Sequence, residues 1–354
     1  MHTVLINAYE SVLRTVCIGT DFLSVSQLKR NTRPLQLIFA IFIYDSHFYI
    51  SFTSPPLPTP GFLLKAFFLS LASPTRVYTL DNDVLTTEQR QFYEENGYLI
   101  IKKLVSDEDI ERFRKEFVRI CNKEVNPLGA MIMKDEMLRS QSVLPEKVVN
   151  KVQDFQEDEE LFRYCTLPQV LKYVECFTGP NIMAMHTMLI NKLPDSDKQT
   201  FRHPMHQDLH YFPFRPADRI VCSWTAMERT DRNNGCLAVL PGTHKESLKP
   251  HGYPEWEGIV NKLFHGILDY DENSPRVHVI MEKGDTVFFH PLLIHGSGVN
   301  KTSGFRKSIS CHFASSECYY IDVKNTVQED LEKETVEIAR RKFNASSLDL
   351  KVRL

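Results

Sequence analysis

The stretch that decides the fold is Phe305-Arg306-Lys307-Ser308-Ile309-Ser310-Cys311-His312-Phe313. Side chains alternate between the two faces of a β-strand, and polar and apolar residues separate here with that period, apart from Lys307. The polar face carries Arg306, Ser308, Ser310 and His312, and the apolar face carries Phe305, Ile309, Cys311 and Phe313. A polar face inside and an apolar face outside suit a barrel whose mouth holds a polar ligand and whose outer surface is covered by helices.

The rest of the chain supplies strands and helices for such a barrel. Thr86-Thr87-Glu88-Gln89 has the form of a helix capping box, Gly97 stands where the helix should end, and Ser106 opens a second helix. A short strand is expected between these helices, at residues 98–101. Further short apolar runs bounded by Pro, Asp, Asn or Gly predict strands at residues 185–190, 220–227, 236–240 and 286–289. We therefore predict a mainly β protein with flanking helices.

These patterns divide the chain into regions. After an atypical extension (1–77), one domain is expected at 78–354, made of mostly helical support (78–182), the barrel core (183–325) and a C-terminal helix and tail (326–354). The extension contains an apolar run at residues 35–44, but this is shorter than the roughly 18 residues that a spanning helix needs. We expect the extension to be disordered or removed by processing, without stable membrane insertion. A membrane-associated hairpin is the alternative.

Composition excludes several classes of partner and site. The net charge of −3 provides no basic field, so nucleic acid is not an expected partner. The eight cysteines form no Cys-x-x-Cys pair and no zinc-finger spacing. Several of them lie in apolar runs, where a thiol acts as a small core residue, and this favours a reducing compartment.

Two histidines and one aspartate have the pattern of a metal site. In an extended strand His206 and Asp208 point to the same side while Gln207 points away, and His295 must come from another strand. Two imidazoles and one carboxylate are the set that holds non-haem Fe(II) on one face of its octahedron. Three coordination positions stay open for a bidentate 2-oxo acid and O2.

Other histidines compete for this role. His290 lies close to His295, but the proline after it and the Gly-Ser-Gly that follows His295 favour His295. His203, His210 and His312 are expected to support the ligands or to pack in the core. The segment His206 to His210 also resembles the zinc-protease helix, but Gln207 stands where that mechanism needs a general base, and nearby prolines oppose a long helix.

Arg306 supplies a cation for a carboxylate. It lies on the polar face of its predicted strand, where a guanidinium can clamp a carboxylate through charge-assisted hydrogen bonds. Ser297 can donate a hydroxyl to the same carboxylate. Iron ligands followed by such an anchor predict an Fe(II) enzyme with a 2-oxo acid co-substrate.

Six segments resemble the phytanoyl-CoA dioxygenase family, and the resemblance extends from about Tyr78 to the C-terminal helix. They are Asp154-Phe155-Gln156-Glu157-Asp158, Phe177-Thr178-Gly179-Pro180-Asn181, His206-Gln207-Asp208-Leu209-His210-Tyr211, Asn233-Asn234-Gly235-Cys236-Leu237, Leu240-Pro241-Gly242-Thr243-His244 and His295-Gly296-Ser297. The resemblance implies the double-stranded β-helix (jelly-roll) barrel of the 2-oxoglutarate oxygenases. It also implies hydroxylation of phytanoyl-CoA and related branched acyl-CoAs at C2, the first step of fatty acid α-oxidation, with Fe(II), 2-oxoglutarate, O2 and ascorbate.

The resemblance also assigns residues. It implies that His206, Asp208 and His295 bind the iron, and that Arg306 and Ser297 hold the distal carboxylate of 2-oxoglutarate. It places four further residues at the co-substrate: Lys151, Met188, Gln207 and Trp224. It implies a peroxisomal location, although residues 1–77 and Lys351-Val352-Arg353-Leu354 contain no clear targeting signal. An oxygenase with a different small substrate and a non-enzymatic adaptor with the same fold are the alternatives.

Overall fold

The computed structural model describes most of the chain from Arg76 onward. It describes residues 76–127, 129–134, 145–194, 202–253, 255–256, 259–260, 264–326, 328–329 and 332–333. The expected N-terminal extension and most of the expected C-terminal helix and tail (326–354) lie outside this part. No helix in the part described is both long and apolar enough to cross a membrane.

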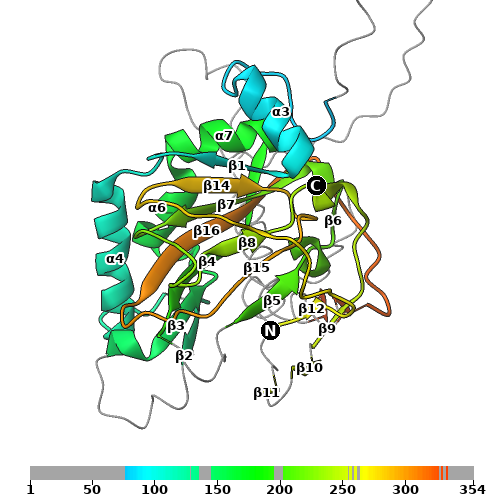
Figure 1. The fold of residues 1–354 in the computed structure, drawn as a ribbon. Helices are drawn as coiled ribbons and strands as arrows, with labels where there is room; N and C mark the ends of the chain where they lie inside the picture. Colours follow the sequence, from blue (N-terminus) through cyan, green and yellow to red (C-terminus); the bar gives the residue numbers. More distant parts are fainter. Residues whose placement is uncertain are drawn as a thin grey trace, which may run out of the picture.

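A seven-stranded antiparallel sheet forms the larger wall of the barrel (Figure 1). Its order is β1 (Tyr98–Ile101), β14 (Thr286–Phe289), β7 (Ile220–Ala226), β16 (Arg306–Ser315), β4 (Ile182–Lys192), β3 (Val149–Gln153) and β2 (Met131–Lys134). The predicted strands at residues 98–101, 185–190, 220–227 and 286–289 all belong to this sheet. Strands β2 and β3 were not predicted, and they show that the supporting region before residue 183 also extends the barrel wall.

A four-stranded sheet forms the opposing wall. Its order is β13 (Val277–His278), β8 (Leu237–Val239), β15 (His295–Ser297) and β5 (His203–His206). Among the described residues there are also three short strand pairs: β6 (Phe214–Arg215) with β17 (Tyr319–Tyr320), β9 (His251–Gly252) with β12 (Gly266–Ile267), and β10 (Glu255–Trp256) with β11 (Ile259–Val260). Residues from both large sheets line one cavity between them.

In the part of the chain that the structure describes, four α-helices flank the larger sheet (Figure 1). They are α3 (Thr87–Asn96), α4 (Asp107–Cys121), α6 (Glu159–Thr166) and α7 (Pro168–Thr178), and short 3-10 turns occur at η1 (Pro145–Lys147), η2 (Asp208–Tyr211), η3 (Ala217–Arg219) and η4 (Thr243–Lys245). The predicted capping box of α3 is confirmed: Thr86 accepts from the Gln89 backbone, and the Gln89 side chain accepts from the Thr86 backbone. Gly97 ends this helix at φ 79°, and Ser106 caps α4.

Strand β16 divides the core from the cavity as its alternation predicts. Ile309, Cys311 and Phe313 are fully buried in the main hydrophobic core, in the same cluster as aromatic side chains of α4 and α7. Arg306 and His312 lie on the other face and line the cavity. Burial of each large apolar side chain contributes about 1.5–3 kcal/mol to folding stability. Packing against the helices therefore fixes the outer face of β16, while the polar side chains of its inner face line the cavity.

Candidate active site

The three predicted metal ligands converge at one edge of the smaller sheet. His206 ends β5, His295 begins β15, and the two are paired directly across the sheet. Gln207 is extended, with φ −119° and ψ 124°, so Asp208 returns to the side of His206 although it begins the turn η2 rather than continuing a strand. Asp208 Oδ1 lies 3.2 Å from His206 Nε2 and 3.7 Å from His295 Nε2.

Backbone carbonyls orient both imidazoles toward this point. His206 Nδ1–H donates to the Pro204 carbonyl and His295 Nδ1–H donates to the Leu293 carbonyl, each at 2.9 Å. Because a carbonyl can only accept, Nδ1 of each ring carries a hydrogen, and Nε2 is the nitrogen that faces Asp208. Burial lowers the pKa of His295 to about 4, so this ring is neutral at pH 7. Candidate ligand atoms of the three residues lie within 4.8 Å of one another, which suits a single metal ion.

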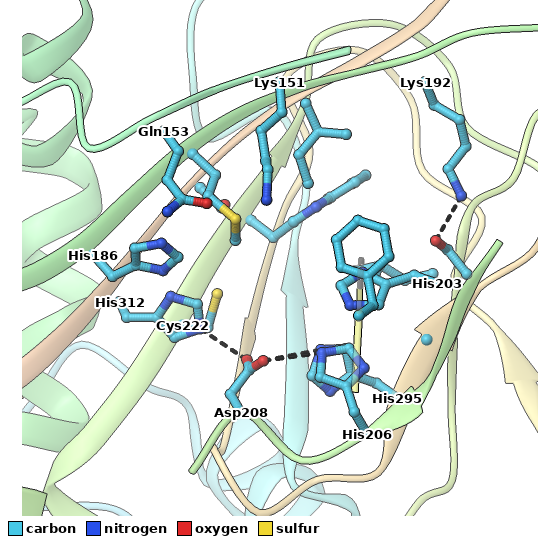
Figure 2. A pocket seen from close by; sticks show the side chains of 18 of the residues that line it. Lys151, Gln153, His186, Lys192, His203, His206, Asp208, Cys222, His295 and His312 are labelled. Atoms are coloured by element: carbon cyan, nitrogen blue, oxygen red, sulfur yellow. Dashed lines mark hydrogen bonds and ion pairs between the residues drawn. The ribbon is translucent and has the colours of Figure 1, made fainter. Parts of the chain in front are cut away.

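His312 holds the second oxygen of the carboxylate. Its Nε2–H donates to Asp208 Oδ2 at 2.8 Å, which leaves Oδ1 for the metal (Figure 2). Burial would raise the pKa of Asp208, but His295, His312 and His206 together lower it well below its ordinary value. The aspartate is therefore ionised, as a metal ligand must be.

Removal of the His312 hydrogen bond should weaken metal binding without destroying the site. Hydrogen-bonding partners of metal ligands typically contribute about 10- to 100-fold to metal affinity or activity. We expect His312→Phe, which keeps a ring in this buried position, to weaken Fe(II) binding by about that factor. A metal titration measures the change, and an unchanged affinity together with normal folding would contradict the role assigned to His312.

His290 lies outside this cluster. Its Nε2 is 3.3 Å from Asp218 Oδ1, and its Nδ1 accepts from the Leu292 backbone. His210 also has a separate environment, because its ring stacks on His251 and its Nε2 lies 3.0 Å from His265 Nδ1. Neither belongs to a group of candidate metal ligands within the residues described.

Gln207 does not line the cavity. Its side-chain amide donates to the Leu292 carbonyl at 2.9 Å, and its Oε1 accepts from the Lys249 backbone at 2.8 Å. Its backbone N–H donates to His251 Nε2, also at 2.9 Å. The co-substrate role implied for Gln207 therefore lacks support from side-chain contacts, because the turn points this side chain away from His206 and Asp208. His251, which fixes that turn, has no signal in the local sequence.

Arg306 occupies a buried end of the cavity with only 2% of its surface exposed. It donates to Ser308 Oγ at 2.8 Å and to the Gly235 carbonyl at 3.0 Å, and its guanidinium lies 5.3 Å from the centre of the Trp224 ring. Its Nε has no hydrogen-bond partner among the residues described. Burial lowers the pKa of Arg306 to about 10, so it is charged at neutral pH.

The remaining predicted co-substrate residues also line the cavity: Lys151, Met188, Trp224 and Ser297. Register explains this convergence, since Ser310 of β16 is paired with both Met188 of β4 and Trp224 of β7. The structure adds cavity residues that the sequence did not single out, namely Gln153, His186, Lys192 and Cys222 (Figure 2). The local sequence around these residues contains no motif that marks a binding site. Only the pairing of the strands shows that they line the cavity.

Comparison with known proteins identifies the family. The family model described as phytanoyl-CoA dioxygenase (PhyH) matches residues 93–308. The chain is 72% identical over 276 residues to the human protein "Phytanoyl-CoA dioxygenase, peroxisomal", covering 77% of this chain and 82% of that protein. It is 55% identical over 278 residues to "Probable phytanoyl-CoA dioxygenase" of Caenorhabditis elegans, covering 77% and 89%.

Solved structures show the same fold at low sequence identity. The crystal structure of SnoK, a non-heme alpha-ketoglutarate-dependent carbocyclase from nogalamycin biosynthesis, superposes with a TM-score of 0.51 at 19% identity, covering 74% of this chain and 94% of SnoK. The predicted jelly-roll fold is confirmed. The match to the family model and the identity with the close relatives show that this chain belongs to the phytanoyl-CoA dioxygenase family.

Proposed function

We propose that the protein hydroxylates phytanoyl-CoA to 2-hydroxyphytanoyl-CoA, with Fe(II), 2-oxoglutarate and O2. The observation that carries this proposal is that the His206–Asp208–His295 cluster and the buried Arg306 line the same cavity. The names of the close relatives support the acyl-CoA substrate and a peroxisomal location, where the product enters fatty acid α-oxidation. Ascorbate would keep the iron reduced.

The cluster fits the iron that this function requires. His206 and His295 each direct Nε2 toward Asp208, His295 is neutral at pH 7, and Asp208 presents an ionised oxygen. These ligands occupy three positions and leave the others for the 2-oxo acid and O2. When bound, the iron couples oxidative decarboxylation of 2-oxoglutarate to hydroxylation of the substrate.

Residues of both sheets would position 2-oxoglutarate. Arg306 supplies a planar cation and Ser297 a hydroxyl for the distal carboxylate. Trp224 packs against the guanidinium, and Met188 provides an apolar wall beside it. Lys151 adds a positive charge from β3, where its Nζ lies 5.4 Å from the centre of the Phe264 ring. These contacts select an anion and restrict its orientation.

Apolar side chains complete the cavity and exclude water. Met131, Met133, Ile190 and Phe264 line it alongside the polar groups. Such a lining suits a branched acyl chain and keeps solvent away from a strongly oxidising centre. The same lining could accommodate another apolar substrate, so the choice of substrate must be tested directly.

The test is succinate release from 2-oxoglutarate by the purified chain with Fe(II), measured with and without phytanoyl-CoA. Strong stimulation by phytanoyl-CoA and formation of the 2-hydroxy product are expected. Succinate release that phytanoyl-CoA leaves unchanged would retain the oxygenase and reject this substrate. Folded, iron-loaded protein that releases none would instead favour an adaptor.

Lys151 should make 2-oxoglutarate binding pH-dependent. Burial lowers its pKa to about 8, and Asp154 opposes this only in part. Lys151 is charged below pH 8 and neutral above it, so attraction of the dianionic co-substrate is lost as pH rises through 8. We expect kcat/KM for 2-oxoglutarate, which reports ionisations in the free enzyme, to fall above about pH 8. Lys151→Met should lower kcat/KM at pH 7 and remove this fall, whereas an unchanged pH profile would contradict the role.

The same ionisation has the opposite effect on stability. An unfolded lysine has a pKa of about 10.4, so between about pH 8 and 10.4 the unfolded chain binds more protons at this position than the folded one. The contribution of Lys151 to stability therefore rises with pH across that window. Weaker co-substrate binding above pH 8 should thus occur without unfolding caused by this residue.

A further inference from the structure

Two buried cations lie side by side at one end of the cavity. Lys192 is the last residue of β4 and Arg306 the first of β16, and the two are directly paired across the antiparallel ladder. Lys192 is 6% exposed and Arg306 is 2% exposed. Both line the cavity that contains the metal cluster.

The proximity of two positive charges carries a free-energy penalty at this end of the cavity. Like charges directly opposite each other in paired strands are destabilising, and burial adds a desolvation penalty to each charge. The hydrogen bonds of Arg306 go to neutral oxygens, those of Ser308 and Gly235, and the charge of Glu228 opposes the effect of burial on the Arg306 pKa only in part. A carboxylate bound between the two cations would offset both penalties.

Lys192 also determines in which direction the hydroxyl of Ser297 can donate its hydrogen. Its Nζ donates to Ser297 Oγ at 2.7 Å (Figure 2). It also contacts the Gly298 carbonyl. A serine hydroxyl has one hydrogen and two lone pairs. When the ammonium group occupies a lone pair, the Ser297 hydrogen is left for an acceptor in the cavity. Lys192 thereby makes Ser297 a donor.

Gly235 packs both cations in place. A Cβ atom at this position would lie 2.8 Å from Lys192 Cδ and 2.7 Å from the Gly298 carbonyl oxygen. The stem of Lys192 therefore runs tightly along the backbone of Gly235, whose carbonyl accepts from Arg306. One backbone position thus contacts both side chains and limits their freedom before any ligand binds, as preorganised sites require.

We propose that Lys192 is a positioning residue for the distal carboxylate of the 2-oxo acid, acting through Ser297 and adding a second positive charge beside Arg306. The inference rests on the proposed function, because it assigns this end of the cavity to 2-oxoglutarate. Its consequence is selectivity: Lys192 favours a dicarboxylate over a monocarboxylate of the same chain length.

The test compares two ligands that differ only at the distal group. Calorimetric titration of the full chain loaded with Mn(II) measures binding of 2-oxoglutarate and of 2-oxopentanoate, which has a methyl group where 2-oxoglutarate has its distal carboxylate. Lys192→Met keeps most of the stem and removes the charge and the donor. We expect it to weaken 2-oxoglutarate about 10- to 100-fold and to leave 2-oxopentanoate nearly unchanged. Lys192→Arg should retain more of the preference than Lys192→Met does.

A double-mutant cycle tests whether Lys192 acts through Ser297. If it does, Lys192→Met and Ser297→Ala together should weaken 2-oxoglutarate binding by less than the product of their separate effects. Equal weakening of both ligands by Lys192→Met would make Lys192 a merely structural residue and overturn the inference. If Lys192→Met fails to fold, Lys192→Gln replaces it under the same criteria.

The result for the unmodified chain separates this inference from the function itself. If the chain binds 2-oxoglutarate much more tightly than 2-oxopentanoate and Lys192→Met keeps that preference, only the role of Lys192 fails. If the unmodified chain binds neither ligand, the proposed co-substrate fails and the inference fails with it.

Discussion

His295→Ala should abolish stoichiometric Fe(II) binding and lower the hydroxylation rate at least about 1000-fold, because a bound metal contributes several kcal/mol and each 1.4 kcal/mol is tenfold in rate. His295 is directly opposite His206 in the smaller sheet, and its Nε2 faces Asp208. No other histidine is paired with His206 in this way within the residues described. Metal analysis and succinate release measure the two losses.

His290→Ala is the matched control. His290 is also a buried histidine, close in sequence to His295, but it contacts Asp218 and the Leu292 backbone instead of the cluster. This variant should keep its iron and its metal-dependent rate even where its stability falls. If His295→Ala kept both iron and activity, the alternative group formed by Asp208, Cys222 and His312 would become the better metal site.

Arg306→Leu should raise KM for 2-oxoglutarate by roughly 30-fold to several thousand-fold, since loss of one partner from a buried charge pair costs about 2–5 kcal/mol. The effect should be large because Arg306 is almost completely buried and water cannot replace it. Steady-state kinetics with varied 2-oxoglutarate at saturating phytanoyl-CoA measure the change.

Two comparisons make the Arg306 result specific. KM for phytanoyl-CoA should change by less than about threefold, because the substrate does not depend on the distal carboxylate contact. Arg306→Lys should recover only part of the affinity, since an ammonium group cannot reproduce the planar two-point contact of a guanidinium. An unchanged KM for 2-oxoglutarate in folded Arg306→Leu would contradict the assignment.

Local sequence patterns predicted the elements whose signals are local. The alternation of residues 305–313 identified the wall strand β16 and its two faces, and the capping box of Thr86 identified the start of α3. His206 and Asp208 are separated by one extended residue, so their common direction follows from backbone geometry. These features depend on neighbours in the chain and were therefore accessible before the fold was known.

Features that depend on strand pairing could not be predicted from local sequence patterns. Strands β2 and β3 lack clear alternation, and Lys151 reaches the cavity only because β3 pairs with β4. Lys192 is at the end of an ordinary apolar strand, and its importance appears only when Arg306 is found opposite it. The position of His251 beside Gln207 likewise depends on the approach of a distant loop.

The most direct measurement follows both atoms of oxygen-18-labelled O2 during turnover of phytanoyl-CoA by the Fe(II)-loaded chain with 2-oxoglutarate. We expect one labelled atom in the hydroxyl group of 2-hydroxyphytanoyl-CoA and the other in succinate, with neither product formed by His295→Ala. Two results would contradict oxygenation of this substrate at the His206–Asp208–His295 site. One is the absence of hydroxylated acyl-CoA. The other is a hydroxyl oxygen that comes entirely from water when oxygen exchange with the solvent has been excluded.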